Sequence, residues 1–98
     1  MNTSKNDQTE WVWVFFIDPG ANEQILGQYD KEQDVAYIPV VDSKETALQC
    51  YHMLSKNPEK KYEATAIMID DLSEQAQAGD FSLYFLNGDG KILDSRKP

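Results

Sequence analysis

The sequence predicts an α+β domain with a single, mainly antiparallel sheet of five or six strands and two helices, in the order β-β-β-α-β-α-β-β. Three observations predict it. The chain opens on a continuous apolar run, it carries one clear stripe of apolar residues at helical spacing, and its other apolar segments are short and separated by turn residues. We expect residues 10–94 to form a single domain, between a flexible polar tail at 1–9 and a polar tail at 95–98.

The first strand is predicted at residues 10–17, because Trp11–Ile17 is apolar throughout. A half-buried strand would alternate apolar and polar residues. Both faces of this strand therefore need cover, which predicts a central strand. Turn residues follow at 18–22, and residues 23–29 are predicted to pair back as a hairpin, because Gly27 inside the segment disfavours a helix.

The next strand is predicted at Val35–Val41. Pro39 lacks a backbone N–H and cannot donate to a ladder, so this strand lies at an edge or Pro39 faces an unpaired side.

The clearest helix follows, with Asp42 as the cap and Glu45 completing a capping box, or with Ser43 as the cap. Its apolar stripe has members at i, i+3, i+4 and i+7. They are Ala47, Cys50, Tyr51 and Leu54.

A strand at Tyr62–Ile69 leads into a short second helix, for which Asp71 and Glu74 form a capping-box pattern and Gly79 supplies the stop. The last hairpin joins strands at 81–86 and 91–94 through the turn 87–90.

The net charge of −8 argues against direct nucleic-acid binding, which needs lysine and arginine at the phosphates. The single cysteine excludes an internal disulfide. The apolar run is too short to span a membrane and lacks the basic flank of a signal peptide, so the sequence predicts a cytoplasmic protein.

No residue set predicts catalysis, a cofactor or a metal, and the sequence favours a protein that is not an enzyme. His52 lies on the charged helix face without a partner, and Cys50 belongs to the apolar stripe. Residues 87–90 lack the first and last ligands of a calcium loop and are predicted to be a hairpin turn. Asp70 and Asp71 are explained by the positive end of a helix dipole.

The chain resembles a small uncharacterised domain family of photosynthetic lineages over its first two-thirds. The resemblance rests on short motifs, with Pro39 and the hairpin 81–93 as departures, and it implies no activity. The motifs are the strand Val12–Phe16, then Asn22-Glu23-Gln24-Ile25, the strand Val35–Val41, the helix around Ala47–Leu54, and Glu63–Glu74.

The sequence therefore predicts a non-enzymatic protein–protein interaction or regulatory module that forms a homodimer through one apolar face of its first strand. Aromatic residues are favoured at such interfaces. The seam would hold either Trp11, Trp13 and Phe15 or Val12, Val14 and Phe16. In a monomer, helices, loops or the tail would cover both faces.

The alternative is an acidic inhibitor that occupies a basic, nucleic-acid-binding surface on a target protein. Two groups of acidic residues would make the contacts. They are Asp30, Glu32 and Asp34, with Asp70, Asp71 and Glu74.

Overall fold

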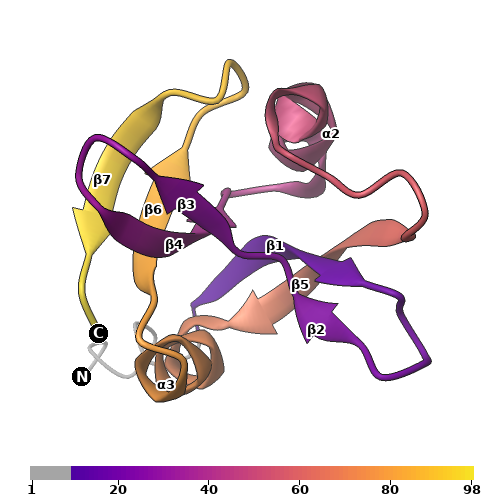
Figure 1. The fold of residues 1–98 in the computed structure, drawn as a ribbon, viewed down its shortest axis with the longest axis horizontal. Coiled ribbons are helices and arrows are strands. Elements are labelled where there is room, and N and C mark those ends of the chain that lie inside the picture. The colour runs from indigo at the N-terminus through magenta and orange to yellow at the C-terminus, as the bar shows by residue number, and fades with distance from the viewer. Residues whose placement is uncertain (1–9) are drawn as a thin grey trace, which may run out of the picture.

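The computed structural model describes residues 10–98 as an α+β fold of seven strands, two α-helices and a short 3₁₀ helix (Figure 1). The strands are β1 (Trp11–Ile17), β2 (Gln24–Ile25), β3 (Gln28–Asp30), β4 (Val35–Val40), β5 (Tyr62–Met68), β6 (Ser82–Leu86) and β7 (Ile92–Arg96). The helices are α2 (Lys44–Cys50), η1 (Tyr51–Met53) and α3 (Ile69–Ala78).

The prediction of a single sheet is wrong, because the strands form two sheets. One has the order β2-β1-β5 and is antiparallel, and the other has the order β3-β4-β6-β7, with β4 and β6 parallel. The segment predicted as one hairpin strand, 23–29, changes sheet at Leu26–Gly27, so that β2 pairs with β1 and β3 pairs with β4. An isolated bridge between Trp13 and Val41 joins the two sheets.

The Phe81 side chain packs closely against Gly27, where the chain changes sheet. A Cβ atom placed on Gly27 would lie 2.7 Å from Cε1 of Phe81, and one placed on Gly79 would lie 2.8 Å from the other edge of the same ring. The Phe81 ring therefore lies between two glycines, one in the β2–β3 link and one at the end of α3. A larger residue at either glycine would displace this ring.

Pro39 lies in β4, which is an interior strand with β3 on one side and β6 on the other. Val41 exchanges both backbone hydrogen bonds with Trp13 at 2.9 Å, and Pro39 faces the same edge as Val41 because strand residues alternate. Pairing with β3 ends at Tyr37. Pro39 therefore occupies the gap between two partners, which is the second of the two predicted placements.

The first helix is shorter than predicted, and it begins at the rival cap. Ser43 Oγ accepts a hydrogen bond from the Thr46 backbone N–H at 3.1 Å, and the α-helix ends at Cys50. The second helix begins at Ile69, ahead of the predicted capping box, and Gly79 ends it as predicted. Neither helix in residues 10–98 has the length and apolar character needed to cross a bilayer.

The core divides into two clusters, one on each face of β1, as the apolar run predicts. Val12 and Val14 pack with Leu72 of α3, whereas Phe15 packs with Ala47 and the residues around α2. In Figure 1, β1 lies between α2 and α3. Both edges of β1 are also paired, one with β5 and the other with β2, Leu26 and Val41. The prediction of a central strand is confirmed.

Candidate protein-interaction site

The predicted seam residues of β1 lie mostly inside the chain's own core. Val12, Val14 and Phe15 are buried, and Trp13 and Phe16 are half-buried. Trp11 is the exception, with 58% of its surface exposed. Among residues 10–98, α3 packs on one face of β1 and α2 packs on the other.

The predicted acidic contacts fall on two separate elements, the β3–β4 turn and the first turns of α3. Asp30 Oδ1 accepts hydrogen bonds from the backbone N–H groups of Glu32 and Gln33, and its Oδ2 accepts one from the Tyr84 hydroxyl at 3.0 Å. Both oxygens of Asp30 therefore serve the fold. The other acidic side chains of the two groups are exposed: Glu32, Asp34, Asp70, Asp71 and Glu74.

Cys50 and His52 lie where their sequence pattern places them. Cys50 is fully buried in the cluster beside α2, and this burial raises the pKa of its thiol. A buried thiol with a raised pKa is a weak nucleophile, because the thiolate is the reactive form. His52 is exposed on η1.

The 87–90 segment forms a hairpin turn. The Asn87 side chain accepts hydrogen bonds from the backbone N–H groups of Asp89 and Lys91 at 2.9 and 3.0 Å. Its backbone N–H donates to the Lys91 carbonyl at 3.0 Å. Across residues 10–98, no group of three or more His, Cys, Asp and Glu side chains could hold a metal ion.

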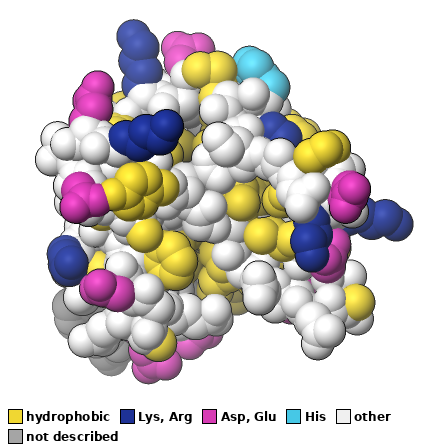
Figure 2. All heavy atoms as spheres, in the orientation of Figure 1, with side chains coloured by type: hydrophobic (Ala, Val, Ile, Leu, Met, Phe, Trp, Pro, Cys, Tyr) yellow, Lys and Arg dark blue, Asp and Glu magenta, His cyan; other side chains and the backbone are white. Residues whose placement is uncertain are grey.

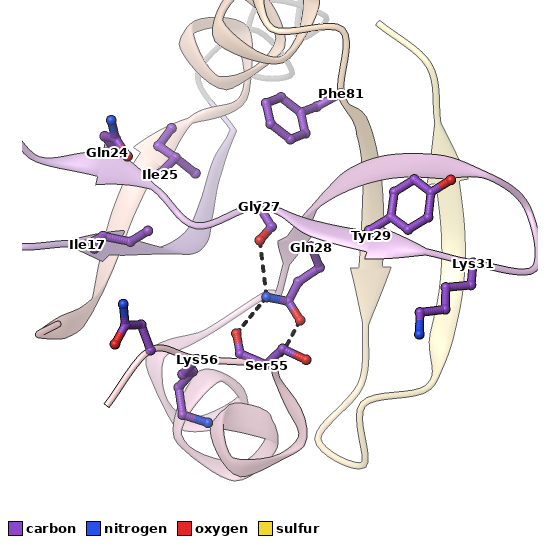
Figure 3. A pocket seen from close by; sticks show the side chains of 11 residues that line it. Ile17, Gln24, Ile25, Gly27, Gln28, Tyr29, Lys31, Ser55, Lys56 and Phe81 are labelled. Atoms are coloured by element: carbon purple, nitrogen blue, oxygen red, sulfur yellow. Dashed lines mark hydrogen bonds between the residues drawn. The ribbon is translucent and has the colours of Figure 1, made fainter. Parts of the chain in front are cut away.

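An open groove of about 760 Å³ runs along the β2–β3 link (Figure 3). Apolar side chains gather toward the middle of the face in Figure 2, and charged side chains of both signs lie mostly around its perimeter. The Gln28 amide extends from the link and bonds to the backbone of Ser55 in both directions, at 2.8 and 2.9 Å. Phe81 lies on the opposite side of the link from Ser55.

The groove is lined mainly by uncharged side chains. Its lining contains amides, hydroxyls, apolar groups and two lysines, but no carboxylate, imidazole or thiol. Lys56 Nζ is already engaged, because it donates to the carbonyls of Tyr51 and Leu54 at 2.8 and 3.0 Å and lies 4.3 Å from the Tyr51 ring centroid. Tyr29 and Lys31 are the other side chains of the lining that can transfer a proton.

The outer edge of β5 is a second feature with an available surface. On its inner edge, the Ile69 N–H donates to the Glu10 carbonyl and the Asp18 N–H donates to the Lys61 carbonyl. Hydrogen-bonded pairs alternate in an antiparallel ladder, so the odd-numbered residues of this segment face β1. The backbone groups of the even-numbered residues face away, and within residues 10–98 no strand pairs with them. They are Tyr62, Ala64, Ala66 and Met68.

The sequence of β5 does not protect this edge. Natural edge strands are commonly guarded by lysine, proline, bulges or shortness. β5 pairs with β1 over seven residues in continuous register, and Glu63 is its only charged residue. The low charge of 62–68 was visible in the sequence, but only the strand order shows that this segment has an open edge.

Comparison with known proteins finds no matching family model, no matching curated protein and no matching solved structure.

Proposed function

We propose that this chain is a non-enzymatic protein-interaction module that associates with a second copy through the outer edge of β5. The observation that carries the proposal is a seven-residue edge strand with outward-facing backbone donors and acceptors and almost no charge, beside which residues 10–98 place no further strand. Addition of a strand to such an edge is a common mode of protein recognition. The proposed contact surface is therefore the edge of β5, whereas the sequence predicted a face of β1.

The β5 sequence is compatible with antiparallel pairing to itself around Thr65. In this register, the outward-facing residues Ala64 and Ala66 oppose each other, and Tyr62 opposes Met68 of the second copy. Thr65 opposes Thr65, and threonine pairs are favourable across strands. Glu63 opposes Ile67 of the second copy, so no like charges meet directly. The register thus uses the whole strand without a repulsive pair.

Backbone hydrogen bonds would hold the two copies together. Met68 is the N-cap of α3, so its carbonyl is already committed to the first turn of that helix. The remaining outward-facing groups supply about six hydrogen bonds across the twofold axis. The product is a continuous six-stranded sheet, with the order β2-β1-β5 followed by its symmetric copy.

The acidic-inhibitor alternative has less support from the geometry. Both carboxylate oxygens of Asp30 accept hydrogen bonds, from its own turn and from Tyr84. Asp30 is one of the six acidic residues that the inhibitor hypothesis uses, and its engagement by a partner would break these bonds. The other five lie on two elements, the β3–β4 turn and α3.

A disulfide trap tests the register. Thr65→Cys places two thiols opposite each other in a non-hydrogen-bonded pair, where Cα atoms lie about 4.5 Å apart, within the span of a disulfide. We expect a covalent dimer under mild oxidation, seen on a non-reducing gel. Ile67→Cys is the matched control, because Ile67 opposes Glu63 and its thiol has no partner. Equal trapping at both positions would contradict the register.

Light scattering tests the association itself. The wild-type chain should dimerise with increasing concentration, and Ala66→Pro should be monomeric because it removes an outward-facing donor while every bond to β1 stays. Thr65→Glu tests the same point without proline, since it places like charges opposite each other. Circular dichroism should show both variants folded. A wild-type chain that stays monomeric at about 1 mM, where even a weak association is populated, would refute the proposal.

A further inference from the structure

A second, smaller site lies at the opening of β1, where the ends of β4 and β6 meet it. It is a pocket of about 180 Å³ whose walls include the core residues Val12, Val40, Val41 and Leu86. Trp11 and Leu93 also line it, and they are 58% and 67% exposed. Two large exposed apolar side chains therefore line an opening into the core.

The volume of this pocket decides what can enter it. Small-molecule sites usually span about 300–1,000 Å³, so 180 Å³ is too small for a typical ligand of that kind. It suits one apolar side chain of a larger partner. Binding energy at protein interfaces concentrates where one anchor enters such a pocket, often beside a tryptophan.

The charges around the pocket select the rest of the partner. Glu10 and Asp42 line it and are exposed, and no ion pair to either is present among residues 10–98. Arg96 also lines it, but its guanidinium lies 4.6 Å from the Phe85 ring centroid and its Nε is 3.5 Å from Asp94. The available charge at the rim is therefore negative.

Further carboxylates lie just beyond the rim. The Ile69 N–H donates to the Glu10 carbonyl at 2.9 Å. Asp70 and Asp71 are the next two residues along the chain, in the first turn of α3. The whole chain carries a net charge of −8, which reinforces the attraction for a cationic partner.

We propose that the pocket beside Trp11 binds a basic peptide segment of a partner protein, with one apolar side chain in the pocket and flanking lysine or arginine side chains at Glu10 and Asp42. The Trp11 ring gives one of those cations a face to stack on. This function goes beyond self-association, because it uses a different surface from the outer edge of β5.

Fluorescence anisotropy with a dye-labelled synthetic peptide tests the proposal. The probe has a central leucine between two lysines on each side, and two control peptides replace the leucine by serine or the lysines by glutamate. The leucine–lysine peptide should bind at least about 10-fold more tightly than either control. Equal binding of the serine peptide would reduce the effect to general attraction by an acidic surface and would overturn the proposal.

Variants localise the binding. Trp11→Ala should weaken the leucine–lysine peptide by about 10-fold or more, and Asp42→Asn should weaken it less. Glu45→Gln is the matched control, because Glu45 is an exposed carboxylate near Asp42 that does not line the pocket. Circular dichroism confirms that each variant is folded. Unchanged affinity for Trp11→Ala would overturn the proposal.

Two other occupants are distinguished by the same assay. A deletion of residues 1–9 that is required before the peptide binds would assign the pocket to the chain's own N-terminal segment. Peptide affinity that falls as the chain concentration rises would assign it to a second copy. Either result would overturn the proposal, whereas equal affinity for the Thr65→Cys trapped dimer and the monomer would support a site separate from β5.

Discussion

The two sheets end in edge strands of opposite character, β5 in one and β7 in the other. All five residues of β7 are exposed, its pairing with β6 is interrupted by a register shift at Phe85/Leu86, and it carries Asp94 and Arg96. β5 pairs without interruption, most of its residues are half-buried, and it carries one charge. β7 therefore has the features that prevent strand addition, and β5 lacks them.

The difference shows that protection against pairing is local to a strand. The net charge of −8 keeps chains apart at long range, but screening limits that repulsion to about 8–10 Å at physiological salt. Once two chains touch, the residues of the edge itself decide whether strands pair. The unprotected edge of β5 is therefore a better candidate than the edge of β7 for a functional contact between chains.

The largest expected effect is on the free energy of unfolding, which should respond differently to truncation of a core residue beside β1 and of a residue on β7. Leu72 is fully buried against Val12 and Val14, so Leu72→Ala should reduce the free energy of unfolding by about 2–5 kcal/mol. Leu93 on β7 is 67% exposed, and Leu93→Ala should change it by less than about 0.5 kcal/mol. Urea denaturation measures both. Similar losses would mean that β7 is as firmly packed as the sheet that contains β5.

Hydrogen exchange compares the two edges of β5 within one strand. At a total chain concentration about 100 times the dimer dissociation constant, about 7% of the chains remain monomeric, so exchange of the outward-facing Ala64 and Ala66 amides should slow by about 15-fold relative to the dilute chain. The Thr65 amide already bonds to β1 and should change far less. Exchange of the β7 amides should not depend on concentration. Protection that rises in β7 instead would reverse the assignment of the two edges.

A smaller effect is expected from Tyr84, which ties β6 to the β3–β4 turn. Tyr84→Phe removes the hydrogen bond to Asp30 and should cost about 1 kcal/mol at neutral pH, with self-association unchanged. Burial first, and then the contact with Asp30, raise the pKa of Tyr84 above its ordinary value of 10.0. Its contribution is therefore present below pH 10 and is lost as the pH rises further.

Comparison of the wild-type chain with Tyr84→Phe tests this pH dependence of stability. Above pH 10 the unfolded wild-type chain releases the Tyr84 proton more readily than the folded chain, so wild-type stability should fall more steeply than that of Tyr84→Phe. The stability difference between them should narrow, as measured by urea denaturation at several pH values. A difference that widens with pH would contradict the role assigned to the hydroxyl.

Parts of the fold were predictable because they depend on local sequence. The apolar run Trp11–Ile17 placed β1 at the centre with cover on both faces, and Gly79 marked the end of α3. Pro39 restricted β4 to two placements, one of which the structure adopts. Each inference used the chemistry of a residue that permits few alternatives.

The two-sheet arrangement and the open edge were not predictable, because they depend on contacts between distant segments. The parallel pairing of β4 with β6 joins residues more than 40 positions apart, and no local pattern specifies it. Gly27 did signal irregularity in the 23–29 segment, but its reason is Phe81, far along the chain. The β5 edge became visible only when the strand order was known.

The Phe81 ring between Gly27 and Gly79 provides a way to recognise distant homologues of this chain. A side chain at either glycine would displace the ring, so the three positions should change together or not at all during evolution. A glycine after the second strand, with glycine-x-aromatic after the second helix, is therefore a signature by which distant descendants of the same ancestor could be recognised, even where the rest of the sequence has diverged.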